Sequence, residues 1–402
     1  MQKFEKHSPV VVTEVTTKHE LRQFMQYPNR LYADNPNYIP SFYGDDLSDW
    51  TPGKNPAFDY CEARCWLARR DGEIVGRIGA ILSHKANDKF GTHRMRFSQV
   101  DFVDDSEVSA ALFGTVERWA REKGCDQVHG PLGFTDMDRE GMLVEGFDRR
   151  SLFFTNYNAP YYLEHLTRLG YRKDVDWIEY RITVPEPGGA EAERLHKLSE
   201  FILKRKHLHV ATVHHKSEYG PFVRQVFELV NAAYAPLYGV VELSDEQIER
   251  YANKFIPLVD PDFVCFVVDE QDQLVAFGVT ALDPSVALKH SDGRLFPFGW
   301  AGVLNDLHHS DTLIMLLTAV RPDLQTEGIN AVMMDHVCQS CNRHGVRFAE
   351  TGPMLELNDH ILAQWKRLEK EQHKRRRCFI KDLDHDVNAA NAAAAQTAVS
   401  YT

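Results

Sequence analysis

The sequence predicts an α/β protein with a mixed sheet, built as two tandem copies of one unit. Strand-like and helix-like patterns alternate along the chain, and segments of the two halves match at an offset of 200 residues. A chain of 402 residues also exceeds one ordinary core and suits two domains of about 200 residues each.

Hydrophobic periodicity and turn residues place the elements of the first half. The expected order is strand 9–17, helix 19–32, hairpin 65–83, strand 94–102, helix 106–124, strand 126–131, helix 160–170 and strand 175–184. The hairpin turns at Asp71-Gly72, and Gly124 marks the end of the long helix.

The second half repeats this order with one added segment. The expected order is strand 207–215, helices 222–237 and 245–255, hairpin 265–282, strand 311–322, helix 329–345, strand 346–353, helix 360–370 and strand 376–383. About 22 extra residues precede the strand at 311, including the segment 288–306, and they have no equivalent in the first half.

Residue-level similarity indicates an internal duplication. CWLARRDGEIVG at 65–76 aligns with CFVVDEQDQLVA at 265–276, and NAPYYLEHL at 158–166 aligns with NDHILAQWK at 358–366. The predicted organisation is an N-terminal domain 1–184, a Pro/Gly-rich linker 185–193, a C-terminal domain 194–385 and an Ala-rich, disordered tail 386–402.

Charge and composition limit the classes of partner. A net charge of -12 argues against nucleic acid and against anionic lipid, because the one basic cluster, Lys374–Arg377, is short. No window approaches about 18 apolar residues, and the start lacks a signal-peptide pattern. We therefore expect a cytoplasmic protein with no nucleic acid partner and no membrane partner.

The cysteines predict neither disulfides nor a metal site. Seven cysteines at irregular spacing are typical of reduced thiols in a large chain. Cys338 and Cys341 have His336 and His344 nearby, but on a helix these four side chains spread around the axis instead of converging.

The segment RPDLQTEGIN, residues 321–330, predicts an anion-binding turn. A strand ending near Val320 and a helix beginning near Ile329 would leave several backbone amides unpaired between them. Gly328 would let a ligand approach the backbone, and the helix dipole favours phosphate. The turn is not a Walker loop, because no Gly-Lys-Ser/Thr follows, and it is not a dinucleotide fingerprint, because only one glycine is present.

This stretch resembles the signature of the GCN5-related N-acetyltransferases (GNATs). In that family an apolar strand ends near a proline, and a Gln/Arg-x-x-Gly-x-Gly/Ala turn before a helix holds the pyrophosphate of acetyl-CoA. Here Asn330 replaces the last small residue. The resemblance implies acetyl-CoA, or another acyl-CoA, bound by Ala319, Val320, Gln325, Thr326, Glu327, Gly328, Ile329, Asn330 and Asn358.

The first copy differs at the equivalent turn. Val103-Asp104-Asp105-Ser106-Glu107 has no glycine and three carboxylates, which cap a helix well and repel pyrophosphate. The chain thus resembles tandem GNAT-fold proteins with a single CoA site, in the C-terminal domain.

The resemblance implies direct attack of a substrate amine on the thioester, with a carboxylate as base. Glu350, at the end of a predicted strand, is the first candidate and Glu356 the second; capping or solvated roles are the alternatives for both. Family members often place a tyrosine acid seven residues after the position of Asn358, and this chain has Trp365 there.

The loop from about 131 to 158 is aperiodic, yet it is rich in aromatic residues and glycine, which predicts order. It could line an acceptor pocket between the domains or simply pack there. The predicted acceptor-binding residues are Asp136, Asp138, Glu145, Asn156, Tyr157, Asn158 and Tyr161.

The leading hypothesis is an acyl-CoA-dependent N-acyltransferase, acting from acetyl-CoA on a small amine or amino-acid-like acceptor. Two alternatives stay open. One is a non-catalytic protein that binds CoA or an amine, and the other is a tRNA-dependent aminoacyl transferase of a related tandem fold, against which the acidic charge counts.

Overall fold

The computed structural model describes residues 8–383. The tail predicted at 386–402 lies outside this range. The strands are β1 (Val11–Glu14), β2 (Cys61–Arg70), β3 (Glu73–Ser83), β4 (Arg94–Phe102), β5 (Gln127–Gly130), β6 (Met142–Glu145), β7 (Arg172–Thr183), β8 (His209–Val210), β9 (Val264–Val268), β10 (Leu274–Leu282), β11 (Thr312–Val320), β12 (Phe348–Glu350), β13 (Met354–Leu355) and β14 (Lys370–Asp382).

Twelve α-helices accompany these strands in the described part of the chain. They are α1 (Lys18–Leu31), α2 (Tyr43–Asp49), α3 (His84–Phe90), α4 (Ser106–Glu122), α5 (Tyr161–Arg168), α6 (Ala190–Lys206), α7 (Gly220–Tyr234), α8 (Asp245–Phe255), α9 (Ser285–His290), α10 (Gly299–His309), α11 (Asn330–His344) and α12 (Asp359–Ala363).

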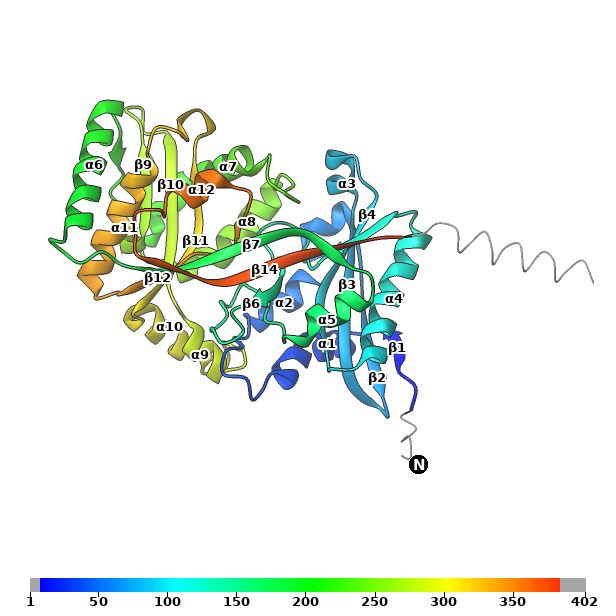
Figure 1. Ribbon diagram of the computed structural model, residues 1–402. Coiled ribbons are helices and arrows are strands. Elements are labelled where there is room, and N and C mark those ends of the chain that lie inside the picture. Colours follow the sequence, from blue (N-terminus) through cyan, green and yellow to red (C-terminus); the bar gives the residue numbers. More distant parts are fainter. Residues whose placement is uncertain (1–7, 384–402) are drawn as a thin grey trace, which may run out of the picture.

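All the strands belong to one mixed sheet that runs through both halves (Figure 1). Its order is β1-β2-β3-β4-β5-β14-β7-β12-β11-β10-β9-β8, with β6 on β14 and β13 on β7. Each half contributes an antiparallel run that ends in one parallel pair, β4 with β5 and β11 with β12. The predicted α/β mixed sheet with a duplicated unit is therefore confirmed.

The two halves exchange their last strands at the centre of the sheet. β14, the last strand of the described residues, pairs with β5 of the first half, while β7 of the first half pairs with β12 of the second. β7 and β14 pair with each other over their length and cross between the halves in Figure 1. Each half is thus completed by a strand of the other.

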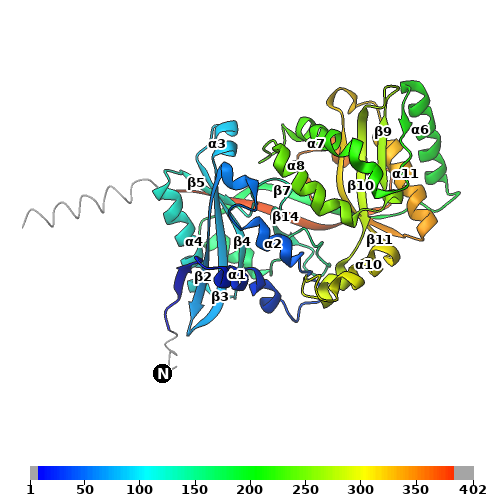
Figure 2. The same ribbon diagram turned by 180° about the vertical axis from the view of Figure 1, so that it is seen from behind.

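Helices cover both faces of each half. In the second half, α6 and α11 pack together on one face, and α7 and α8 lie on the other, as the reverse view of Figure 2 shows. In the first half, α4 packs on a core that includes Phe97 and Phe113, and α1 packs on a second core around Phe24 and Trp50.

Several predicted elements differ from the structure. The predicted linker contains the start of α6, because its glycines precede a helix-forming run that begins at Ala190. The predicted strand 207–215 is reduced to β8, and the predicted helix 360–370 to α12, because the chain after Ala363 turns inward and bends into β14 at Lys370.

Candidate functional site

The turn between β11 and α11 presents backbone amides that have no partner. β11 ends at Val320, a 3-10 turn covers Pro322–Leu324, and α11 begins at Asn330. Within residues 8–383, no hydrogen bond is donated by the amides of Thr326, Gly328, Ile329 and Asn330. The turn is largely exposed, so an anion can reach these donors.

Gly328 is required by the backbone geometry of this turn. Its φ is +80°, in the left-handed region, and a Cβ there would lie 3.2 Å from Cδ1 of Ile202 on α6. Beside it, Gln325 donates from Nε2 to the Val320 carbonyl at 3.3 Å, and Glu327 pairs with Lys206 at 2.6 Å.

β11 and β12 separate beside this turn. They pair in parallel only from Thr312 to Ile314 on β11, after which β12 ends at Glu350 and β11 continues to Val320. A register shift between β10 and β11 leaves Leu316 as an extra residue, a β-bulge. The result is a V-shaped gap in the sheet.

An apolar pocket lies on the α11 face of this gap, and we call it the α11 pocket. α11 contributes Met333, Met334 and Val337, and the segment between α12 and β14 contributes Trp365 and Leu368. The remaining wall is mostly apolar and comes from β7, α6, β10, β11 and β12.

A second apolar pocket, the α7 pocket, lies on the opposite face. Its walls come from α7, α8, β9, β10 and β11, with Phe227, Phe255 and Phe266 among them. Val279 and Leu317 line both pockets. The gap between β11 and β12 is therefore bordered by apolar space on both faces of the sheet.

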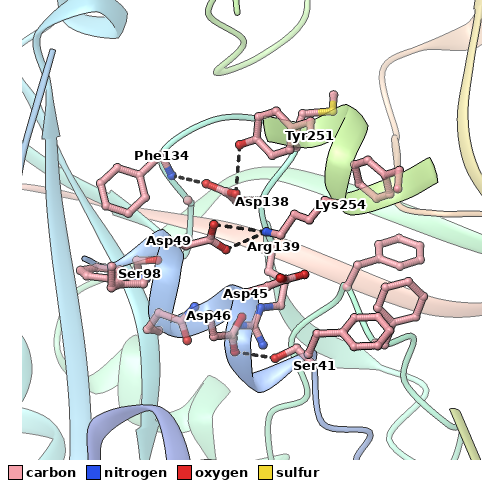
Figure 3. A pocket seen from close by; sticks show the side chains of 18 of the residues that line it. Ser41, Asp45, Asp46, Asp49, Ser98, Phe134, Asp138, Arg139, Tyr251 and Lys254 are labelled. Carbon is pink, nitrogen blue, oxygen red and sulfur yellow. Dashed lines mark hydrogen bonds and ion pairs between the residues drawn. The ribbon is translucent and has the colours of Figure 1, made fainter. Parts of the chain in front are cut away.

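A third pocket, the interunit pocket, lies between the two halves (Figure 3). α2 contributes Asp45, Asp46 and Asp49, and α8 contributes Tyr251 and Lys254. The remaining wall includes Ser98 and Gln99 of β4, Asp138 and Arg139 of the 131–158 loop, and Phe153 and Phe154. The two short helices that follow α1 and α7 thus face each other across this pocket.

The interunit pocket reaches toward the gap in the second half of the sheet. Gly352, which follows β12, links the two regions. A Cβ built on Gly352 would lie 3.6 Å from Cε2 of Phe154, in the interunit pocket, and 3.4 Å from the carbonyl oxygen of Met315 on β11. Phe255 lines both this pocket and the α7 pocket. A molecule in the interunit pocket could therefore approach the bulged part of β11.

One carboxylate of the interunit pocket has no side-chain partner. Asp46 accepts from Arg139 at 2.8 Å, and Asp49 accepts from Lys254 at 2.9 Å. Asp45 makes no side-chain hydrogen bond or ion pair with any residue in 8–383. Burial raises the pKa of Asp45 from 3.8 to about 6, and the charge of Lys254 offsets part of this effect.

Burial also raises the pKa values of acids in the neighbouring 131–158 loop. Desolvation raises the pKa of Asp136 to about 6 and raises the pKa values of Asp138 and Glu140. Asp138 nevertheless accepts the amide of Phe134 at 2.8 Å, so its position is fixed. The wall of the interunit pocket therefore contains Asp138, whose carboxylate is held by hydrogen bonds, and Asp45, whose carboxylate has no side-chain partner in the described part of the chain.

Solved structures of GNAT proteins match the fold along nearly the whole chain. A tandem GNAT protein from the clavulanic acid biosynthesis pathway superposes with a TM-score of 0.53 at 13% identity, covering 93% of this chain and 99% of that one. The chain is a tandem GNAT-fold protein. A GCN5-related N-acetyltransferase from Sphaerobacter thermophilus gives a TM-score of 0.50 at 13% identity, covering 93% and 96%.

Two curated proteins are similar to this GNAT-fold chain in sequence. Protein YghO of Escherichia coli K12 is 27% identical over 379 residues, which is 93% of this chain and 95% of that protein. A bacterial ceramide synthase of Caulobacter vibrioides is 28% identical over 300 residues, covering 73% and 75%. No family model matches the sequence.

The equivalent turn of the first GNAT-like unit is closed by its own side chains. Asp105 caps α4, accepting the amides of Glu107 at 2.9 Å and Val108 at 3.4 Å. Arg70 pairs with both Asp105 and Glu107, and Asp104 accepts from His165. Two amides at the start of α4 are therefore occupied by a side chain of the same unit.

The predicted bases are both held in ion pairs. Glu350 Oε1 pairs with Arg181 at 3.0 Å, and Glu350 Oε2 with the buried Lys374 at 3.3 Å. Glu356 pairs with Lys173 and with Arg375. Neither carboxylate lines the three pockets, so their catalytic roles stay predictions.

Two further positions singled out by the family pattern have clear structural roles. Asn358 caps α12, accepting the amide of Ile361 at 3.2 Å. Trp365, where a tyrosine was expected, is buried in the wall of the α11 pocket and donates from Nε1 to the Met354 sulfur at 3.2 Å. Trp365 is therefore placed to contact a ligand in that pocket.

Among the residues predicted to bind the acceptor, Asp138 lines the interunit pocket and the others do not. Asp136 is adjacent in the loop. The remaining five bond within the protein: Glu145 to Arg375, Asn156 to the Gly141 carbonyl, Tyr157 to the Phe147 carbonyl, Asn158 to the Leu143 amide and Tyr161 to the Phe102 carbonyl.

The sequence analysis missed the α2 and α8 walls of the pocket. Asp45, Asp46 and Asp49 belong to the run YGDDLSDW, which carries no catalytic spacing. A signal was present in the duplication, because α2 and α8 occupy the same place in the two units and therefore come from matching parts of the repeat.

Proposed function

We propose that this protein is an acyl-CoA-dependent N-acyltransferase, with acyl-CoA bound by the C-terminal unit and the amine bound in the interunit pocket. The observation that carries the proposal is the set of unpaired amides of Thr326, Gly328, Ile329 and Asn330. They follow β11, a bulged strand that separates from its neighbour β12. Apolar space and carboxylates lie beside the gap between these two strands.

The donor would follow the gap between β11 and β12. Its diphosphate would accept hydrogen bonds from the free amides at the start of α11, where the helix dipole also favours anions. The pantetheine arm would then run along Met315 to Thr318, which are partly exposed in an otherwise buried strand. Acyl-CoA supplies an activated thioester carbonyl at this point.

The structure favours an acyl chain longer than the acetyl group that the sequence predicted. An acetyl group needs little apolar space, whereas both pockets beside Leu317 are lined almost wholly by carbon and sulfur. Met333 and Met334 can adapt to a flexible chain. The similarity to a protein named bacterial ceramide synthase supports the same choice.

The interunit pocket suits the amine. An alkylammonium group could pair with the carboxylate of Asp45. Phe153 and Phe154 provide an apolar surface in the same pocket for the alkyl part of the amine. The amine must lose a proton before it attacks. Asp45 is the group we assign as proton acceptor, because its oxygens are unpaired and the oxygens of Glu350 are not.

Thiol release from a series of acyl-CoAs tests the proposal. The full-length protein would be incubated with acetyl-, octanoyl- and palmitoyl-CoA and a panel of short and long amines, and free CoA would be measured. We expect amine-dependent release, greatest with the longer donors. Binding without release for every pair would favour the non-catalytic alternative.

A glycine pair provides a matched test of the phosphate site. Gly328→Asp places a carboxylate among the free amides, whereas Gly345→Asp places one at the other end of α11, also at a left-handed φ of +71° and with no atom within 4 Å. We expect Gly328→Asp to abolish the thermal shift caused by acyl-CoA and Gly345→Asp to retain it. An unchanged shift in Gly328→Asp would place the donor elsewhere.

A further inference from the structure

Exposed apolar side chains are concentrated in one inserted segment. Of the eleven large hydrophobic residues that are strongly exposed in the described chain, five lie between residues 286 and 304. Phe296 and Phe298 are 80% and 81% exposed, and Trp300 and Leu304 are about half exposed. We call these four residues the aromatic patch. Single exposed apolar residues are ordinary, but a cluster on one short segment indicates a contact surface.

The patch is carried on a folded support. α9 and α10 bury Leu288, Val303 and Leu307 in a cluster that also contains Phe153 and Ile314. Trp300 donates from Nε1 to the Pro297 carbonyl at 3.2 Å, which fixes its ring over the turn. The patch therefore keeps its shape while its apolar side chains face water.

The same support touches the helix that carries the acidic wall of the interunit pocket. The amide of Tyr43, the first residue of α2, donates to the Gly293 carbonyl at 3.0 Å. Asn29 donates to the Asp292 carbonyl at 3.1 Å. The segment that bears the patch and the helix that bears Asp45 are thus joined directly.

The chemistry of the patch fits a lipid bilayer better than a protein groove or ridge. Phe, Trp and Leu are the side chains that partition into the interfacial region of a membrane, where an indole ring can sit among headgroups. None of the three pockets described above includes a residue of the patch.

Local charge agrees with a lipid surface. The whole chain carries a net charge of -12, yet residues 285–309 contain two cations, Lys289 and Arg294, two carboxylates and three histidines. One of these carboxylates, Asp306, is directed inward and accepts the Ala287 amide at 2.8 Å. Repulsion from an anionic headgroup layer is therefore weak here, although the protein as a whole is acidic.

We propose that the aromatic patch inserts into the interfacial region of a lipid bilayer and holds the mouth of the interunit pocket near the membrane. The sequence analysis expected no membrane partner, on the basis of overall charge and the lack of a spanning segment. No helix in the described residues is long and apolar enough to cross a bilayer, and insertion of a surface patch needs none. This docking does not depend on the proposed acyl transfer.

Vesicle flotation of the full-length protein tests the docking. Vesicles of phosphatidylcholine, alone or mixed with phosphatidylglycerol, would be compared for wild type, for Phe296→Ser/Phe298→Ser and for the control Phe201→Ser. Phe201 is 57% exposed on α6, so the control removes a similar apolar side chain away from the patch. We expect the double variant to lose at least about tenfold in partition and the control to match wild type.

Two outcomes would overturn the proposal. Equal flotation of wild type and the double variant, including no flotation of either, would show that the patch does not contact lipid. A mass in solution that rises with concentration in wild type but not in the double variant, with no flotation, would assign the patch to contact between copies. Because the substituted residues face solvent, thermal melting should be unchanged, which separates lost docking from lost folding.

Discussion

At the residue scale, Asp45 shows how a shared environment gives neighbouring carboxylates different roles. Asp46 and Asp49 take the available cations, Arg139, Lys254 and Arg250, while Asp45 is left with burial and no bonding partner. Burial disfavours the charged form, so its pKa rises to about 6. A carboxyl group with this pKa is an effective proton acceptor for an amine near neutral pH.

Replacing Asp45 by asparagine should therefore remove the base while keeping its shape. We expect the rate of amine-dependent CoA release in wild type to rise with pH through about 6, as the carboxylate forms. Asp45→Asn should lose roughly 10²- to 10⁴-fold in kcat and lose this pH step. Glu350→Gln is the competing variant. If it removes the pH step and Asp45→Asn does not, the base is Glu350.

The same variant should stabilise the fold at neutral pH. A pKa raised from 3.8 to about 6 means that the folded state binds the proton more tightly. The contribution of Asp45 to stability is therefore complete below about pH 4 and is lost as the pH rises through 6. By urea unfolding, Asp45→Asn should exceed wild type by roughly 1 to 3 kcal/mol at neutral pH and match it near pH 4. A gap that widens on acidification would contradict this linkage.

At the element scale, α4 and α11 show how two copies of one unit diverge at a helix start. At the start of α4, Asp105 caps the helix and pairs with Arg70. At the start of α11, the amides are free and Gly328 adopts a left-handed φ. This difference was predictable from the sequence, because capping carboxylates and a positive-φ glycine are local signals. The strands that precede these helices, β4 and β11, were also predictable, because their hydrophobic patterns are local signals.

Elements whose structure depends on distant partners were harder to predict. α12 is short because Trp365 turns into the α11 pocket and the chain then enters β14, which a helical pattern at 360–370 could not reveal. The interunit pocket was only partly foreseen, through Asp138. Its other acids lie on α2, and they face α8, which is about 200 residues away in the chain. A local sequence pattern cannot predict that these two helices lie close together.

The space between α11 and the segment that follows α12 should set the length of the acyl chain. Trp365 fills one wall of this space, and Trp365→Leu would enlarge it. We expect the preferred donor to become longer, with each further buried methylene worth about 0.8 kcal/mol, or roughly fourfold in kcat/KM. The measurement is kcat/KM across saturated acyl-CoAs. Phe227→Leu, in the α7 pocket, is the matched variant, and a shift there with none in Trp365→Leu would move the chain to the other face.

At the scale of the whole molecule, the exchange of β7 and β14 makes the two units depend on each other. Phe379 and Leu383, at the end of the described residues, are buried in the core of the first unit. Arg376 and Lys374 of β14 neutralise Glu179 of β7, and all three side chains are fully buried. Removing β14 would leave a buried carboxylate unpaired and expose the edges of β5 and β7.

A fragment of residues 1–184 should consequently fail to fold as a stable monomer, although it contains a complete GNAT-like pattern. Because Ile182 of β7 pairs with Lys370 of β14, a short glycine-containing turn can join residue 183 to residue 370 as a hairpin. We expect the fragment extended in this way through residue 383 to recover a cooperative urea transition, since the extension restores the partners of β5 and Glu179. Circular dichroism and size-exclusion chromatography compare the two fragments. A cooperative, monomeric 1–184 would mean that the strand exchange adds contact between the units without completing either of them.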